Sequence, residues 1–306
     1  MYEKVLVPLD GSALAELALS YAGELAGRLG SEVTLLNVTE SEEAQDYNQQ
    51  QIYIQQMVDA TKYDAEKYLE KQGGGAIKVV PVILVGRAAE EIMDYASKEN
   101  IDLIIMATHG RSGISRWALG SVADKVVRAS KQPVALIRAK DARSGIREGS
   151  MLNKLLVPLD GSKESETVIP YIEELASKLK TDITLLQVLA QAYHAQAVGV
   201  GGEGVAQIPY TEKEMEPIKV NTESYLQKIS RLLRSKGIAT KIELRVGTEA
   251  EEIINFADEL NMDMVAMSTH GRSGISRWTF GSVADKVLHG GNTPVLLVRV
   301  PKDSTE

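Results

Sequence analysis

Two loop segments of the chain carry the residue types that could bind an anion. One is Asp10–Ser12, with the sequence DGS, and the other is Thr108–Ser121, with the sequence THGRSGISRWALGS. Glycine lets the backbone come close to a ligand because it has no Cβ atom. Ser121 is expected to begin a helix, and the unpaired N–H groups and positive dipole end of a helix N-terminus favour a phosphate. The second segment therefore has the features of a phosphate-binding loop.

The same residues also allow purely structural roles. Ser121 and Asp124 have the spacing of a capping box, as do Ser282 and Asp285, and such a pair can serve only to start a helix. Asp10 can accept from ribose hydroxyls or an adenine amine, it can help to hold a metal, or it can simply hold its own turn. No Walker A sequence occurs, and no GxGxxG follows the first apolar run, so neither a P-loop nor a dinucleotide site is predicted.

Two histidines, His109 and His270, lie in the long loop and in its later counterpart. Neither has a Ser or Cys partner that the sequence reveals, and no GxSxG nucleophile elbow is present. We therefore expect both histidines to pack or hydrogen-bond within their loops, and we predict no catalytic residue. A weak ATPase or phosphotransferase that uses His109 or Asp10 as acid or base is the alternative.

The chain contains one module written twice, and both candidate loops belong to the repeat. Val5–Ser12 returns as Leu155–Ser162, which is an offset of 150. Thr108–Val126 returns as Thr269–Val287 at an offset of 161, with 17 of 19 positions identical. The change of offset predicts 11 additional residues in the second copy between its second strand and next helix. We place them in the glycine-rich segment Gly199–Ile208.

The elements that must position these loops follow from the hydrophobic pattern. A length of 306 residues at about 150 residues per domain gives two domains, expected at 1–140 and 151–306 with a linker at 141–150. Within each copy, short apolar runs alternate with longer amphipathic ones. In the first copy, strands are expected at 5–9, 33–38, 78–85, 101–107 and 134–138, and helices at 12–29, 50–71, 88–99 and 121–130.

This alternation predicts a doubly wound α/β domain in each copy, with a five-stranded parallel sheet and right-handed crossovers. The strands are continuously apolar, as expected for a sheet that is covered on both faces. Ligands of such sheets bind beyond the carboxyl ends of the strands, where the strand order reverses. The loops after the first and fourth strands are therefore the candidate sites.

Composition excludes several classes of function. The chain has 34 Lys and Arg against 42 Asp and Glu, a net charge of −8, with only two Phe and two Trp, so general nucleic-acid binding is disfavoured. Cysteine is absent, which excludes disulfides and thiolate chemistry. No run of 18 apolar residues and no signal peptide is visible, so we expect no membrane span and a cytoplasmic location.

The segments VPLDGS and MATHGRSGISRWALGSVADKV, with MSTHGRSGISRWTFGSVADKV in the second copy, resemble the universal stress protein family in its tandem form. The resemblance covers about residues 2–139 and 152–300. It implies a Rossmann-like fold of the adenine nucleotide alpha hydrolase type with the strand order 3-2-1-4-5. The chain departs from the family's ATP-binding pattern at one position in each copy. The first glycine of the pattern is replaced by Ala107 in the first copy and by Ser268 in the second. Both replacements are tolerated if φ is negative, as at a strand end. Their only effect is then to narrow the space between the backbone and a nucleotide.

The resemblance also implies one adenine nucleotide site in each copy, with Asp10 and Asp160 near the adenosine and the main chain of Val38 and Val188 facing adenine. In the first copy the implied binding residues are Pro8, Asp10, Val38, Met106, Ala107, His109, Gly110, Gly120, Ser121 and Val122. In the second copy they are Pro158, Asp160, Val188, Met267, Ser268, His270, Gly271, Gly281, Ser282 and Val283. No metal-ligating residue of the protein is predicted.

The implied function is a stress-response regulator that binds ATP or another adenine nucleotide, with or without Mg²⁺, and turns it over little or not at all. An interaction module that has lost nucleotide binding is the alternative, motivated by Ala107 and Ser268. By the same resemblance, we expect the two copies to pair through their fifth strands, 134–138 and 295–300, because a bare apolar edge strand favours a partner. A further homodimer of whole chains is also expected.

Overall fold

The computed structural model describes residues 1–40, 44–69, 77–108, 119–138, 150–190, 193–198, 204–271 and 280–301, with backbone only at 44–46, 193–198 and 204–209. His109 and Gly110, residues 141–149 of the linker expected at 141–150, and residues 199–203 of the expected insertion therefore lie outside the described residues. None of the helices in these ranges has an apolar stretch long enough to cross a membrane.

The first domain is a five-stranded parallel sheet with the order β3-β2-β1-β4-β5. This confirms the predicted order 3-2-1-4-5, and the strand bounds agree with the expected ones to within two residues. Its elements are β1 (Lys4–Leu9), α1 (Leu17–Leu29), β2 (Glu32–Thr39), α2 (Ala44–Leu69), β3 (Val79–Val85), α3 (Ala88–Lys98), β4 (Leu103–Ala107), α4 (Ser121–Ala129) and β5 (Val134–Ile137).

The second domain repeats this arrangement with the order β10-β7-β6-β11-β12. A separate antiparallel hairpin of β8 and β9 is added to it. Its elements are β6 (Lys154–Pro158), α5 (Lys163–Glu166), α6 (Ile169–Leu179), β7 (Asp182–Leu189), β8 (Tyr193–Val198), β9 (Gly204–Pro209), α7 (Glu212–Ser235), β10 (Thr240–Val246), α8 (Glu249–Glu259), β11 (Met264–Ser268), α9 (Ser282–Gly290) and β12 (Val295–Val298).

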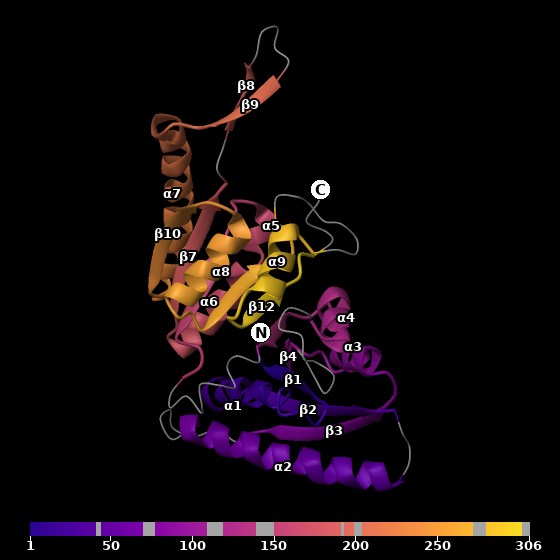
Figure 1. Ribbon diagram of the computed structural model, residues 1–306. Helices are drawn as coiled ribbons and strands as arrows, with labels where there is room; N and C mark the ends of the chain where they lie inside the picture. Colours follow the sequence, from indigo (N-terminus) through magenta and orange to yellow (C-terminus); the bar gives the residue numbers. More distant parts are fainter. Residues whose placement is uncertain are drawn as a thin grey trace.

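The fifth strands of the two domains pair with each other inside the chain. β5 and β12 are antiparallel, with Leu136 opposite Val295 and Val134 opposite Leu297. The two sheets thereby form one continuous ten-stranded sheet (Figure 1). The prediction of an intrachain pairing through the fifth strands is confirmed.

Helices cover both faces of the sheet, as the continuously apolar strands predict. Neighbouring residues of β4 illustrate this, because Ile105 packs with Leu25 of α1 on one face and Ile104 packs with Ile92 of α3 on the other. All four side chains are almost completely buried. Burying a side chain of this size stabilises the fold by about 1.5–3 kcal/mol.

The first helix is shorter than predicted. α1 begins at Leu17, whereas the sequence pattern placed its start at Ser12. Ser12 instead belongs to the preceding turn, where its Oγ accepts from the N–H of Ala15 at 3.2 Å. In the second domain the corresponding segment is a short helix, α5, whose N-cap Ser162 accepts from the N–H of Ser165. The turn that begins at the DGS sequence therefore includes residues that the hydrophobic pattern had assigned to the helix.

The insertion of the second copy is larger than the change of offset suggests. Tyr53 of α2 and Tyr225 of α7 occupy equivalent places beside the DGS loops, next to Glu16 and Glu166. They are 172 positions apart, so 22 residues are added before the helix and 11 are missing after it. The added chain includes the β8–β9 hairpin, which projects away from the ten-stranded sheet beyond α7 (Figure 1).

Candidate functional site

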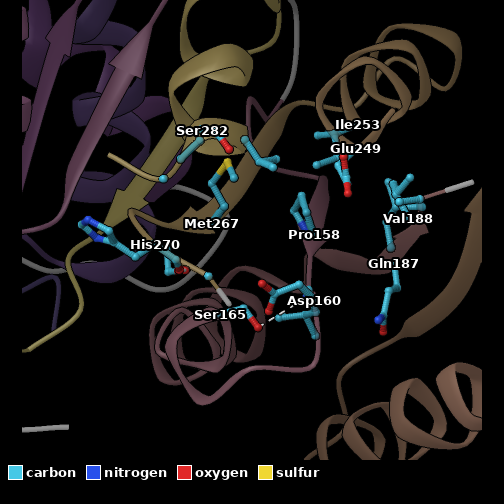
Figure 2. A pocket seen from close by; sticks show the side chains of 18 of the residues that line it. Pro158, Asp160, Ser165, Gln187, Val188, Glu249, Ile253, Met267, His270 and Ser282 are labelled. Carbon is cyan, nitrogen blue, oxygen red and sulfur yellow. Dashed lines mark hydrogen bonds between the residues drawn. The ribbon is translucent and has the colours of Figure 1, made fainter. Parts of the chain in front are cut away.

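Each domain has a cavity at the carboxyl ends of its first and fourth strands, where the strand order reverses. The cavity volume is about 200 Å³ in the first domain and about 310 Å³ in the second. The predicted residues that line the first cavity are Pro8, Asp10, Val38, Met106, Ala107, Gly120, Ser121 and Val122. Those that line the second are Pro158, Asp160, Val188, Met267, Ser268, His270, Gly271, Gly281, Ser282 and Val283 (Figure 2).

The DGS loop holds the aspartate of each site in a tight turn. Oδ1 of Asp160 accepts from the N–H of Ser162 at 2.9 Å and from its Oγ at 2.5 Å. Asp10 makes the same pair of bonds with Ser12, at 3.0 and 2.6 Å. The glycine between them has a φ of 84° in the second domain and 82° in the first, a conformation that favours glycine. The turn role is therefore present, and the same carboxylates line the cavities.

Gly271 lies directly against Asp160. A Cβ atom at position 271 would lie 2.2 Å from Oδ2 of Asp160, far inside van der Waals contact. Any side chain at 271 would thus displace the carboxylate from the wall of the cavity. A side chain at this position therefore fits only if the carboxylate of Asp160 moves, with or without a ligand.

The long loop of each domain leaves and returns at one point. The N–H of Gly120 donates to the carbonyl of Thr108 at 2.8 Å, and the N–H of Gly281 donates to that of Thr269 at 2.9 Å. These bonds hold the residue just before the following helix beside the end of the fourth strand. The helix N-terminus consequently opens onto the cavity.

The structure contradicts the capping-box alternative. The N-cap residues are Gly120 and Gly281, which have no side chain to cap a helix, while Ser121 and Ser282 are the first helical residues. Asp124 does not reach back to the helix start, since its Oδ1 accepts from Nε of Arg128 at 2.7 Å. In the described part of the chain, the N–H groups of the first turn of α4 and α9 have no side-chain cap.

Gly281 itself is not required by the fold. Its φ is −59° and its ψ is 144°, which any residue can adopt. A Cβ atom there would make only ordinary contacts of 3.5 Å with His270 and Thr269. The contrast with Gly271 separates a glycine that lies tightly against Asp160 from one that keeps the cavity wall free of side chains.

The two replaced glycines lie at strand ends, as predicted. Ala107 ends β4 and Ser268 ends β11, and neither is among the described residues with positive φ. Oγ of Ser268 donates to the carbonyl of His270 at 2.5 Å. The additional hydroxyl of the second site is thus engaged within the protein.

The histidine of the second site is a hydrogen-bonded loop residue. His270 is buried, and its Nδ1 lies 2.9 Å from Oγ1 of Thr269. This agrees with the predicted hydrogen-bonding role, while His109 lies outside the described residues. In the ranges that the structure describes, no group of three or more His, Asp or Glu side chains could hold a metal ion.

A half-buried tyrosine lies beside each DGS loop. Burial and the neighbouring Glu16 raise the pKa of Tyr53, and burial and Glu166 raise that of Tyr225. Both hydroxyls therefore remain protonated at neutral pH.

Sequence reasoning missed the wall that is formed by the helix after the third strand. This wall consists of Ala88 and Ile92 in the first cavity and of Glu249 and Ile253 in the second. The strand order offered the signal, because the crossover from the third to the fourth strand carries this helix over the first two strands. Its first turn therefore lies at the carboxyl edge of the sheet.

Comparisons with known proteins agree with the repeated fold. The sequence model of the universal stress protein family matches residues 1–138 and 151–299. Universal stress protein MJ0531 of Methanocaldococcus jannaschii is 29% identical to this chain over 158 residues, which are 51% of this chain and 88% of that protein. The match therefore spans one of the two domains.

Two solved structures extend the comparison. A universal stress protein from Archaeoglobus fulgidus has a TM-score of 0.65 and 20% identity, covering 98% of this chain and 99% of its own. That similarity shows the tandem fold alone. A universal stress protein solved in complex with cAMP is 23% identical with a TM-score of 0.34, covering 45% of this chain and 97% of its own.

Proposed function

The chain belongs to the universal stress protein family, and on that basis we propose that it binds ATP or a related adenine nucleotide in both cavities. In this proposal it is a stress-response protein that responds to the nucleotide and turns it over little or not at all. No side chain of the described residues fills either cavity, which leaves room for a ligand.

One observation carries the proposal: the N-terminus of α9 opens onto the second cavity, no side chain of the described residues caps it, and the adjoining glycine is not required by the fold. Ser282 and Val283 supply backbone N–H groups at this end, where the helix dipole is positive. A phosphate would receive these hydrogen bonds directly, because no side chain at Gly281 stands in the way. α4 offers the first cavity the same arrangement.

The other walls suit the rest of a nucleotide. Asp160 and Val188 line other walls of the cavity (Figure 2), and the family resemblance implies the adenosine beside these residues. Apolar side chains of Met267 and Ile253 complete the wall, as expected for a pocket that encloses a base. Among the described residues, no group of acidic or histidine side chains could hold a metal ion. In this proposal, Mg²⁺ binds together with the phosphates of the nucleotide.

Calorimetric titration with ATP, ADP, AMP and cAMP, each with and without Mg²⁺, tests the proposal. The cAMP arm is included because one universal stress protein was solved with that ligand. We expect two binding events in the wild type, one in Gly120→Val, one in Gly281→Val and none in the double variant. At a ligand concentration of 100 times Kd, one site would stabilise the fold by about 2.7 kcal/mol. No heat and no thermal shift with any nucleotide would contradict the proposal.

A further inference from the structure

The two cavities differ in charge at one equivalent position. Glu249, the first residue of α8, lines the second cavity, and Ala88, the first residue of α3, lines the first. We propose that Glu249 makes the second cavity selective for a purine that bears an amino group, a selectivity that the first cavity lacks. This inference rests on the proposed nucleotide binding.

Glu249 is directed into the cavity. Figure 2 shows its carboxylate on the side of the cavity that carries Val188 and Ile253, with Ser282 and His270 on the opposite side. The side chain is partly buried. Among the described residues, no hydrogen bond or ion pair occupies its oxygens, so they are available to a ligand.

Besides Asp160, whose carboxylate lies against Gly271, two charged features of the second cavity favour one direction of an anionic ligand. The uncapped N-terminus of α9 attracts a phosphate, whereas the carboxylate of Glu249 repels one. The phosphate end therefore lies at Ser282, and the opposite end of the ligand faces Glu249. In a nucleotide that end is the base.

An ionised carboxylate only accepts hydrogen bonds. The base edge that faces Glu249 must therefore offer a donor, which the 6-amino group of adenine or the 2-amino group and N1–H of guanine provides. A bare ring edge leaves the partly buried carboxylate without a partner, and sites built around such a hydrogen bond discriminate strongly against analogues that lack it. The shared chemistry is an amino-bearing purine.

The first cavity lacks this requirement because Ala88 offers only a methyl group. Two walls near the base are alike, since Val38 and Val188 come from equivalent strand ends and Ile92 matches Ile253, but the cavities also differ at Ala15/Ser165 and Ala107/Ser268. Substitutions at positions 88 and 249, and not the comparison of the two cavities alone, therefore test the role of this position.

The experiment reads each cavity separately in the full chain. Gly120→Val blocks the first cavity and leaves the second to be titrated, and Gly281→Val does the reverse. The probes are ATP, GTP and the 5′-triphosphate of unsubstituted purine riboside. In the Gly120→Val background, we expect the unsubstituted purine to bind about tenfold or more weakly than the better of ATP and GTP. In the Gly281→Val background, we expect it to bind within about threefold of ATP.

Two variants test the residue itself. Glu249→Ala should remove the tenfold difference in the second cavity, and Ala88→Glu should create one in the first. Circular dichroism and thermal unfolding verify that each variant is folded. Whichever of ATP and GTP binds better identifies the source of the amino group.

Three results would overturn the inference. One is equal binding of the unsubstituted purine and ATP in the second cavity, and another is an unchanged ratio in Glu249→Ala. Either leaves the proposed function intact. Absence of any nucleotide binding in the wild type removes the proposed function and this inference with it.

Discussion

The carboxylate of Glu24 accepts a hydrogen bond from the backbone N–H of Met151 at 2.6 Å and so attaches the start of the second domain to α1 of the first. Glu24 is completely buried. Its other oxygen is bonded to Arg28 at 2.5 Å and to the hydroxyl of Ser150, and Arg28 also donates to the carbonyl of Leu179. A buried carboxylate with this many partners joins the domains at a second place besides the fifth strands.

Glu24→Ala should therefore destabilise the protein strongly. The variant leaves a mostly buried arginine without its counterion, and breaking a buried ion pair costs about 3–5 kcal/mol. Urea unfolding followed by circular dichroism measures the change. The matched control is Glu174→Ala, the equivalent position in α6, which pairs with Lys178 on a more exposed surface and should cost about 1 kcal/mol or less. Equal losses in both variants would contradict the prediction.

Glu174 should contribute an acid-sensitive part of the stability. Burial raises its pKa, but hydrogen bonds from Lys178 and the amino group of Met1 outweigh that effect and hold the pKa below its ordinary value of 4.5. A carboxyl with a lowered pKa in the folded state stabilises the fold above its unfolded pKa and loses this contribution as the pH falls through the folded value. Urea unfolding between pH 6 and pH 3 should show a shallower acid loss in Glu174→Gln than in the wild type or in the exposed control Glu223→Gln. Identical pH profiles would be evidence against it.

The two glycines of the second site should respond differently to alanine. Gly271→Ala drives a Cβ atom into Oδ2 of Asp160, so we expect a loss of about 1–3 kcal/mol of stability without any ligand. Gly281→Ala meets only ordinary contacts, so stability should change by less than about 0.5 kcal/mol while nucleotide affinity falls. Thermal unfolding without ligand and calorimetry with ATP separate the two effects. A Gly281→Ala variant with unchanged ATP affinity would weaken the case for phosphate at that helix.

Arg128 of the first domain should influence the second cavity. Its guanidinium lies 5.0 Å from the ring centroid of Phe280, the residue before Gly281, and 3.4 Å from Oδ1 of Asp285. A cation–π contact of this exposed kind contributes about 0.5–1 kcal/mol. Arg128→Ala should thus weaken ATP binding in the second cavity by about two- to fivefold.

The matched control for Arg128 is Arg245→Ala. Arg245 lies 5.2 Å from the ring centroid of Phe256 and pairs with Glu259, the same chemistry at a different place on the second domain. Titration in the Gly120→Val background reads the second cavity alone. An equal effect of both variants would show that the position next to Phe280 has no special influence.

The strand positions and strand order were predictable because continuous apolar runs and the repeat constrain them strongly. Where the candidate site departs from the prediction, the cause is local geometry that spacing does not encode. Ser121 has a capping-box spacing with Asp124, but a shift of one residue makes Gly120 the N-cap and leaves Asp124 to Arg128. Glu249 could be found only by placing a distant helix over the same sheet edge.

The insertion illustrates a second limit. Offsets between repeats report only net differences, so a gain of 22 residues before α7 and a loss of 11 after it appeared as a single addition of 11. The equivalent tyrosines, Tyr53 and Tyr225, resolve this because they contact the same loop in each domain. Such a contact belongs to the tertiary structure and has no signature in spacing.

The antiparallel join of β5 and β12 has an evolutionary consequence. In an assembly of two identical chains, every substitution appears on both sides of the symmetry axis, so the halves cannot diverge. Here one polypeptide supplies both sides, and the contact survives any dilution because the partner is tethered. Each half is therefore free to acquire its own preference under separate selection, as the unlike residues at positions 88 and 249 show.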